Sequence, residues 1–203
     1  MLARARPLRP APTRPSSPIR RLGLTQDVSR SFALAAVALA ATVAAASAAT
    51  ETKDQKIARA VSAGPVSVTA QATVADMDAK GNMTVLRKGA NGWTCIPGHP
   101  GVVGDDAMCA DAATMQWGAD WAAHKPKPTN TKPGIAYMLA GGTDWSASDP
   151  FATKGTPIKE PPHWMIMWPV DKTSGLPTTP RDTGTWIMYA GTPYAHLMIN
   201  GRP

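Results

Sequence analysis

The fold is decided by the run Pro162-His163-Trp164-Met165-Ile166-Met167-Trp168-Pro169, which is mostly apolar and has proline at both ends. Successive side chains of a β-strand point to opposite faces of its sheet. The odd-numbered side chains, which include His163, would share one face, and the even-numbered ones, which include Trp164, the other. Both faces are apolar, so the run predicts an interior strand that is covered on both sides.

A second apolar run, residues 185–199, lies nearer the C-terminus, beyond a loop that contains several Pro and Gly residues. Gly191-Thr192-Pro193 interrupts this run. Because both runs need cover on both faces, we expect residues 164–167 and 186–188 to be neighbours or near neighbours in one sheet. The connecting loop of roughly 15 residues is long for a hairpin but allowed.

Two shorter patterns precede these runs. Residues 51–62 predict a short helix, because Thr52 and Gln55 have the spacing of a capping box and a Gly-Pro pair follows. Residues 66–77 alternate between apolar and polar side chains, which predicts a half-buried strand. Residues 83–87 predict its return strand in a hairpin.

One longer helix is predicted from Asp105 or Asp106 to about His124, because apolar residues recur there on one stripe. Residues 134–140 predict a short buried strand, and residues 141–150 a loop rich in Gly, Ser, Asp and Thr. Together the patterns predict an α+β fold: an antiparallel or mixed sheet with one main helix, a short N-terminal helix and one disulfide.

The disulfide is expected between Cys95 and Cys109, the two cysteines of the chain. An even pair of cysteines in an oxidising compartment most simply forms a disulfide. The bond would close a loop of about 15 residues and contribute on the order of 3 kcal/mol in the chain-entropy model.

Residues 1–48 have the three parts of a secretory signal peptide: a basic lead, an apolar stretch, and the small-residue end Ala46-Ser47-Ala48. The alternative is a membrane anchor, but the apolar stretch is shorter than the roughly 20 strongly apolar residues that spanning needs. We therefore expect one domain at residues 49–203, periplasmic or secreted, with no stable membrane anchor after processing. Residues 1–27 are rich in Pro and Arg, which favours an over-extended start and true translation from near Val28.

The formal net charge of +7 belongs mainly to this leader. Residues 1–48 carry seven of the 21 Lys and Arg residues and one of the 14 Asp and Glu residues, which leaves +1 for residues 49–203. Nucleic acids bind strongly basic surfaces. The sequence therefore predicts no nucleic-acid partner.

Two His-x-Met triplets, His163/Met165 and His196/Met198, are the main candidate metal site. Residues i and i+2 of a strand lie about 6.6 Å apart with their side chains on one face. Imidazole and thioether ligands together suit a soft ion, so the two strands predict a copper, Cu(I), site where they approach each other. The alternative is that the methionines simply fill the core.

Seven tryptophans are many for a domain of this size, and exposed ones would form an aromatic platform for sugars or hydrophobic ligands. Trp145, in a polar loop, and Tyr194 are the candidate ligand-binding residues. The tryptophans expected in the core are Trp93, Trp164, Trp168 and Trp186.

No sequence motif identifies a catalysed reaction: the sequence contains no Gly-x-Ser-x-Gly, no Cys-x-x-Cys and no phosphate-binding loop. The patterns favour an exported binding or interaction module whose small ligand or protein partner they do not identify. Catalytic groups assemble in space rather than in sequence, so a small extracytoplasmic enzyme of hydrolase type is one alternative. A structural envelope protein is another.

Four runs carry a resemblance: GANGWTC at residues 89–95, GIAYML at 134–139, DPFAT at 149–153 and GTPYAHLM at 191–198. In them the chain resembles a group of uncharacterised exported bacterial proteins, over about residues 55–199. The resemblance implies export and a single domain. The resemblance implies no activity, no cofactor and no catalytic residue.

Overall fold

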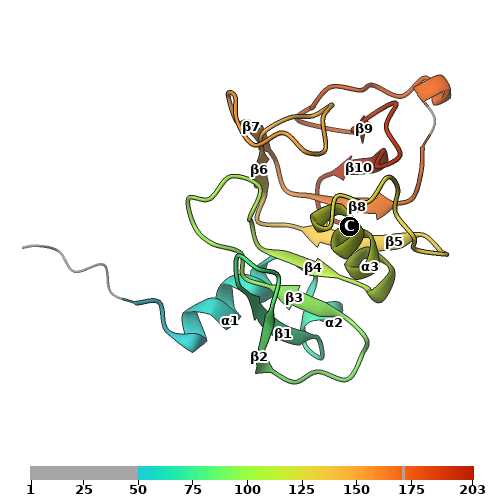
Figure 1. Ribbon diagram of the computed structural model, residues 1–203. Coiled ribbons are helices and arrows are strands. Elements are labelled where there is room, and N and C mark those ends of the chain that lie inside the picture. The colour runs from blue at the N-terminus through green and yellow to red at the C-terminus, as the bar shows by residue number, and fades with distance from the viewer. Residues whose placement is uncertain (1–49, 171) are drawn as a thin grey trace, which may run out of the picture. The chain divides into compact units, whose positions relative to one another are not determined.

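The computed structural model describes residues 50–170 and 172–203, so the signal peptide predicted at residues 1–48 lies outside the described part. A large sheet of eight strands organises this part of the chain (Figure 1). Its strands lie in the order β2-β1-β3-β4-β5-β8-β10-β9, and a separate small sheet pairs β6 with β7.

The strands of the large sheet are β1 (Thr73–Met77), β2 (Met83–Arg87), β3 (Thr94–Ile96), β4 (Met108–Ala110), β5 (Gly134–Met138), β8 (His163–Met167), β9 (Thr185–Met188) and β10 (His196–Asn200). The small sheet consists of β6 (Gly142–Asp144) and β7 (Ile158–Glu160). The helices are α1 (Lys53–Ser62), α2 (Val66–Thr69), α3 (Ala112–Ala122) and the 3-10 turn η1 (Lys172–Ser174). β1 and β3 pair in parallel and the other strand pairs are antiparallel, so the sheet is mixed and the fold is α+β.

The run that decides the fold lies inside the sheet, as predicted. β8 pairs with β5 on one side and with β10 on the other, and β9 pairs with the far side of β10. The two apolar runs are therefore near neighbours. His163, Met165 and Met167 are buried, whereas Trp164 and Ile166 on the opposite face are only half-buried, so that face of β8 is less covered than we expected.

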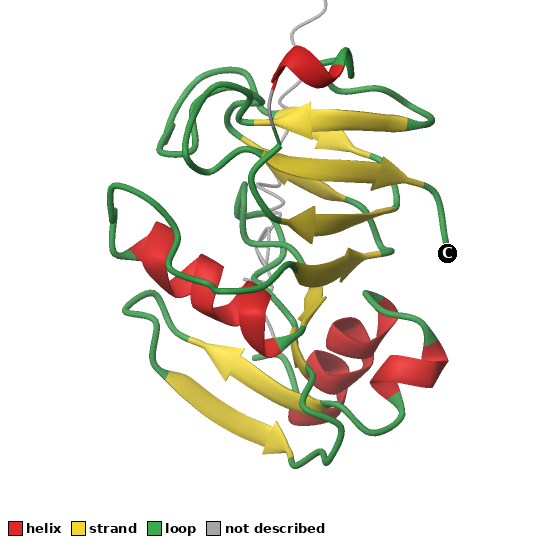
Figure 2. Cartoon of the chain, turned by 90° about the vertical axis from the view of Figure 1, so that its right-hand side faces the viewer, coloured by secondary structure: helices red, strands yellow, loops and turns green. Residues whose placement is uncertain are grey.

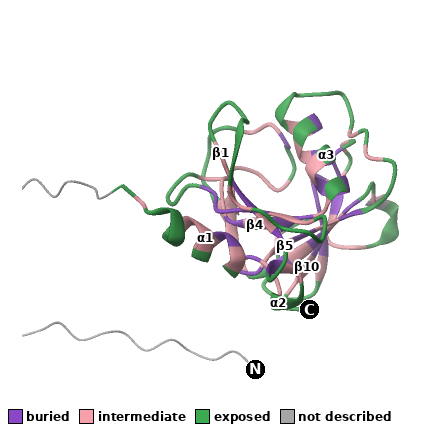
Figure 3. Ribbon diagram, turned by 90° about the horizontal axis from the view of Figure 1, so that it is seen from below, coloured by how far each residue is buried: buried purple, intermediate pink, exposed green. Residues whose placement is uncertain are grey.

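Helices lie on the two faces of the large sheet (Figure 2). α3 packs over β5 and β8 and contributes Trp117 to a buried cluster with Met165 and Met198. On the other face, Ala60 of α1 and the following C-cap residue Ala63 belong to a second cluster that includes the disulfide. The buried residues concentrate in the strands between these layers (Figure 3).

Cys95 and Cys109 form the predicted disulfide. They lie directly opposite each other on β3 and β4, and both are fully buried. Such a bond is consistent with an extracytoplasmic location. Within residues 50–170 and 172–203, no helix has the length and hydrophobicity that crossing a bilayer requires.

The strand predicted over residues 66–77 is wrong in its first part, because residues 66–69 form α2. Val66 is 79% exposed, so the alternation there does not mark a half-buried sheet face. α2 starts directly after Pro65, which has no backbone N–H to donate to a neighbouring strand. The strand begins at Thr73, and its hairpin with β2 is confirmed.

α3 begins at Ala112 rather than at Asp105 or Asp106, because the preceding residues are held as β4 between β3 and β5. Asp111 caps the helix by accepting a hydrogen bond from the Thr114 backbone N–H at 2.8 Å. α1 and α3 have 10 and 11 residues, so the expected contrast between one main helix and a shorter N-terminal helix is not confirmed. Residues 141–150, predicted as a loop, include β6.

Candidate functional site

The structure places the four predicted metal ligands on one buried face of the sheet without gathering them at one point. Met165 and Met198 lie directly opposite each other on β8 and β10. His163 lies opposite Asn200, two residues after Met198 on β10. His196 lies two residues before Met198 on the same strand. The two histidines are thus four positions apart along the strands, roughly 14 Å between their Cα atoms at a rise of about 3.4 Å per residue, yet His163 is close enough to act electrostatically on His196. The structure brings the two methionines together but not the two histidines, and the Cu(I) site stays a prediction.

The two imidazoles are oriented in the same way. His163 Nδ1 donates to the Pro161 carbonyl oxygen at 2.8 Å, and His196 Nδ1 donates to the Tyr194 carbonyl oxygen at 3.0 Å. Burial lowers the pKa of His196 to about 4, so this imidazole is neutral near pH 7, and it packs edge-on against Trp117. No group of three or more His, Cys, Asp or Glu side chains in the described part is arranged to hold a metal ion.

Neither candidate ligand-binding aromatic residue forms an exposed platform. Tyr194 is 1% exposed, and its hydroxyl donates to the Lys125 carbonyl oxygen at 2.9 Å, so it anchors a loop from within the core. Trp145 is half-buried. Trp168, which we expected in the core, is 38% exposed because it lies just beyond the end of β8.

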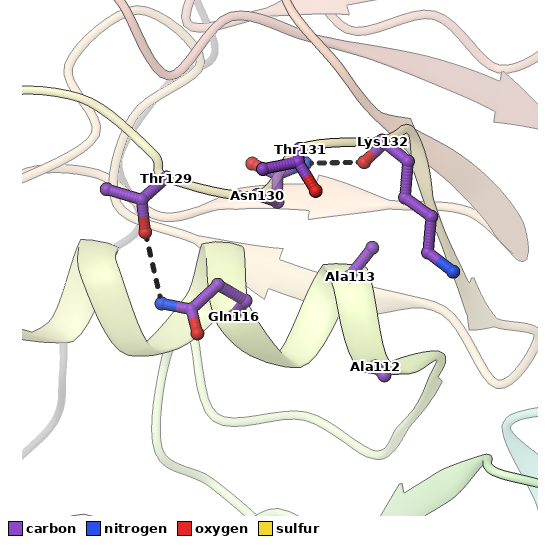
Figure 4. A pocket seen from close by; sticks show the side chains of 7 residues that line it. All are labelled: Ala112, Ala113, Gln116, Thr129, Asn130, Thr131 and Lys132. Atoms are coloured by element: carbon purple, nitrogen blue, oxygen red, sulfur yellow. Dashed lines mark hydrogen bonds between the residues drawn. The ribbon is translucent and has the colours of Figure 1, made fainter.

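Trp168 lines a surface hollow together with residues of the 127–130 segment. One hollow, of about 190 Å³, is lined by Lys127, Pro128, Asn130, Trp168, Pro169 and Pro193. A second hollow, of about 330 Å³, is lined by Ala112, Ala113, Gln116 and residues 129–132 (Figure 4). Asn130 is the one residue that lines both hollows, and together we call the two hollows the 127–132 groove.

A buried carboxylate fixes the wall of this groove. Asp120 of α3 accepts hydrogen bonds from the Thr129 backbone N–H at 2.6 Å, from the Thr129 hydroxyl at 2.7 Å and from Lys125 Nζ at 2.6 Å. Burial by itself would raise the pKa of Asp120, but the hydrogen bonds from Lys125 and Thr129 outweigh it and lower the pKa to about 2. Farther along, Asn130 Nδ2 donates to the Met167 carbonyl oxygen at 3.1 Å. The groove is therefore pinned to both α3 and β8.

The groove combines an aromatic side chain with polar groups and positive charge. Lys127 and Lys132 are exposed, and neither forms an ion pair with a carboxylate of the described part. Gln116 Nε2 already donates to Asp120 and to Thr129, so Gln116 adds its amide oxygen and Thr131 adds a hydroxyl group. No His, Asp, Glu, Cys or Tyr is among the described residues that line the groove. It therefore has groups that bind a polar anion and lacks the usual acid–base pair of a hydrolase.

A second polar cluster is buried where the small sheet meets β8. Glu160 ends β7 and His163 begins β8, both are buried, and 3.8 Å separate Glu160 Oε2 from His163 Nε2. Burial first, and then the negative charges of Asp144 and Asp106, raise the pKa of Glu160 to about 8. Burial also lowers the pKa of His163. Both side chains are therefore neutral near pH 7.

The carboxylates beside Glu160 are held by their own partners. The Tyr189 hydroxyl donates to Asp144 Oδ2 at 2.6 Å, and the Thr143 backbone N–H donates to Asp106 Oδ2 at 2.6 Å. Tyr189 has a φ of 55°, in the left-handed region that aromatic residues rarely adopt. Backbone strain of this kind concentrates at functional sites.

Sequence reasoning missed Asp120, Trp168 and Glu160 as candidate functional residues. The one sequence signal that could have found any of them is Pro169, because a proline directly after Trp168 ends the strand and frees that side chain from the sheet.

Comparison of the chain with models of known protein families, with curated proteins and with solved structures finds no match.

Proposed function

We propose that this protein is an exported binding module, periplasmic or secreted, that takes an acidic oligosaccharide in the 127–132 groove. The observation that carries the proposal is the exposed Trp168, which lines one hollow with Lys127, while Lys132 lines the other; neither lysine has a carboxylate partner in the described part. The disulfide supports the extracytoplasmic location.

Each part of the groove matches one feature of such a ligand. The C–H face of a sugar ring is apolar and packs on an aromatic side chain, which supplies a large rigid surface. Sugar hydroxyls pair with amide and hydroxyl groups of the kind that Gln116 and Thr131 carry. The ammonium groups of Lys127 and Lys132 would face the carboxylates of the ligand.

The groove is also organised before any ligand arrives. Hydrogen bonds to Asp120 hold Thr129, and one hydrogen bond from Asn130 ties the same segment to β8. Prolines at positions 128, 169 and 193 stiffen the walls. Because little has to be ordered on binding, more of the contact energy appears as affinity.

An enzyme has weaker support than a binding module. The described titratable cluster around Glu160 and His163 is buried, and none of its members lines the groove. A general acid or base must come within hydrogen-bond reach of its substrate. The buried titratable residues and the groove are thus in different places, and the groove by itself supports binding.

The test is a calorimetric titration of the protein with a hexamer of galacturonate, with neutral maltohexaose as the control ligand. We expect saturable binding of the acidic hexamer that weakens as salt is added, because salt screens the lysine charges. Trp168→Ala should weaken binding about tenfold or more, equal to about 1.4 kcal/mol. Lys127→Gln and Lys132→Gln should each weaken it several-fold.

Lys80→Gln is the matched control, because Lys80 is an exposed lysine in the turn between β1 and β2. It should bind the hexamer as tightly as the unchanged protein. Absence of saturable binding, or equal losses in Lys80→Gln and the groove variants, would overturn the proposal.

A further inference from the structure

We propose that one face of β5, β8 and β10 is a docking surface for a single amphipathic helix of a partner protein. The surface consists of six large apolar side chains, two from each strand and all half-buried, which we call the apolar face: Ile135, Tyr137, Trp164, Ile166, Leu197 and Ile199. None of them lines the 127–132 groove, and α3, which lines part of that groove, packs on the opposite side of the sheet. The inference therefore stands independently of the proposed oligosaccharide binding.

Strand register places the six side chains in two rows across the sheet. In one row Ile166 lies between Ile135 and Leu197, and in the next Trp164 lies between its register partners on the same two strands. Residues that lie directly opposite each other in an antiparallel pair have side chains on one face, with Cβ atoms about 4.5–5.5 Å apart. The apolar face is therefore continuous, and it contains no charged side chain.

The second row shows where the cover of the sheet ends. Beyond Tyr137 it continues through Cys109 on β4 and Cys95 on β3 to Val74 on β1. Val74 and both cysteines are fully buried, because α1 packs against β1, β2, β3 and β4, at the lower end of the sheet in Figure 2. Tyr137 and Trp164 are only half-buried. One row of side chains is thus covered in one half of the sheet and lacks equivalent cover within the described part in the other half.

The uncovered strip has the width of one helix. Three strands spaced about 4.8 Å apart make a strip about 10–14 Å wide, and a helix with its side chains is about 10–12 Å across. The strip ends at β9, where Ile187 lies opposite Leu197 but is fully buried, and its backbone N–H donates to the Pro177 carbonyl oxygen. A helix on the strip would extend the layer that α1 begins.

A second copy of the chain fits the strip less well than a helix does. Strands of about five residues are about 17 Å long, so the strip covers about 240 Å², whereas each partner of a stable dimer buries about 800 Å². A second sheet would also have to approach within about 10 Å of the first. α1 stands in that layer over the neighbouring strands and leaves room for a narrow element only.

A cation at one end of the apolar face indicates the charge of the partner. The Arg202 guanidinium donates to the Leu139 carbonyl oxygen at 3.2 Å, just beyond the end of β5. It forms no ion pair with a carboxylate of the described part. Charges at the rim of an interface steer and orient the partner. The partner helix should therefore combine an apolar stripe with acidic residues near one end.

The test uses a fluorescein-labelled synthetic peptide of about 14 residues, with leucines at the i, i+3, i+4 and i+7 spacing of a docking helix and glutamates at one end. A second peptide of the same composition has its leucines scattered. Fluorescence anisotropy measures binding to the protein, and we expect saturable binding of the striped peptide only. Combining Ile166→Thr with Leu197→Thr should weaken it at least tenfold, because polar groups then interrupt the apolar face while threonine still suits a strand. Arg202→Gln should weaken it several-fold.

Val85→Thr is the matched control, because Val85 is an apolar residue of β2 that is 53% exposed and lies away from the apolar face. It should bind the striped peptide as the unchanged protein does. Thermal melts show whether the double variant folds, and where it does not, Arg202→Gln decides the outcome.

The proposal is overturned where both peptides bind alike, or where the folded double variant binds as Val85→Thr does. Unchanged binding by Arg202→Gln overturns it where the double variant is unfolded. Sedimentation that shows a dimer which the double variant dissociates would assign the face to a second copy instead. Binding to phosphatidylcholine vesicles that the double variant abolishes, without binding of the striped peptide, would assign it to a lipid surface.

Discussion

Asp120 and Glu160 are both buried carboxylic acids, yet their surroundings are opposite. Four hydrogen bonds reach the Asp120 carboxylate, and its pKa falls to about 2. Glu160 has an oxygen with no partner, lies near two further carboxylates, and has a pKa raised to about 8. A buried carboxylate that is fully paired keeps its charge and holds a structure in place, whereas a buried carboxyl group left unpaired keeps its proton. The first describes the wall of the groove, and the second the buried pair of Glu160 and His163.

The largest expected effect comes from breaking the paired carboxylate. Asp120→Ala should lower the free energy of unfolding by about 2–4 kcal/mol, because it removes four hydrogen bonds to a buried charged acceptor, while Lys125 and Thr129 are exposed and can turn to water. Urea unfolding followed by circular dichroism measures this. Asp182→Ala is the control, since Asp182 is exposed, and should change the free energy by less than about 0.5 kcal/mol. Equal losses in both variants would show that Asp120 is not the fixed point of the groove wall.

The raised pKa of Glu160 should make the free energy of unfolding depend on pH. The folded pKa of Glu160 is raised from 4.5 to about 8, so the folded state keeps a proton that the unfolded state loses. Its stabilising contribution is complete below pH 4.5 and is lost as pH rises towards 8, at about 1.4 kcal/mol per pH unit. Glu160→Gln cannot ionise and should remove this slope.

This is measured by urea unfolding between pH 5 and 9 with a chelator present, so that metal does not contribute. As the pH rises, the free energy of unfolding of Glu160→Gln should increasingly exceed that of the unchanged chain. Parallel pH profiles for the variant and the unchanged chain would contradict the raised pKa.

The smallest effect concerns the neighbour of Glu160. Asp144→Asn removes one of the two negative charges that raise the pKa of Glu160, while the amide oxygen can still accept the Tyr189 hydroxyl. Burial is the larger cause, so the pKa should fall by less than about one unit. Carbon NMR of the Glu160 carboxyl group across pH 5–10 reports this shift, and a rise in pKa would refute the assigned cause.

Local pattern was enough to predict the framework of the fold. The capping box of α1, the hairpin of β1 and β2 and the interior position of β8 follow from neighbours in sequence, and the disulfide follows from the presence of just two cysteines. The α2 segment was missed because alternation alone does not distinguish a half-buried strand from an exposed turn of helix after Pro65.

The candidate sites were not predictable, because they depend on long-range placement. Asp120 acquires its role from Thr129, and Glu160 from His163 and from Asp106, which lies far away in sequence. The predicted His and Met ligands do share one face, as the period of two requires. Strand register, which sequence does not reveal, sets the two histidines four positions apart.

The most direct test of the central claim is amide hydrogen exchange of the protein with and without the galacturonate hexamer. The account predicts slower exchange in residues 127–132 and next to Trp168, and unchanged exchange in β6 and β7 beside Glu160. Slower exchange confined to β6 and β7, with none in residues 127–132, would contradict the assignment of the groove as the oligosaccharide site.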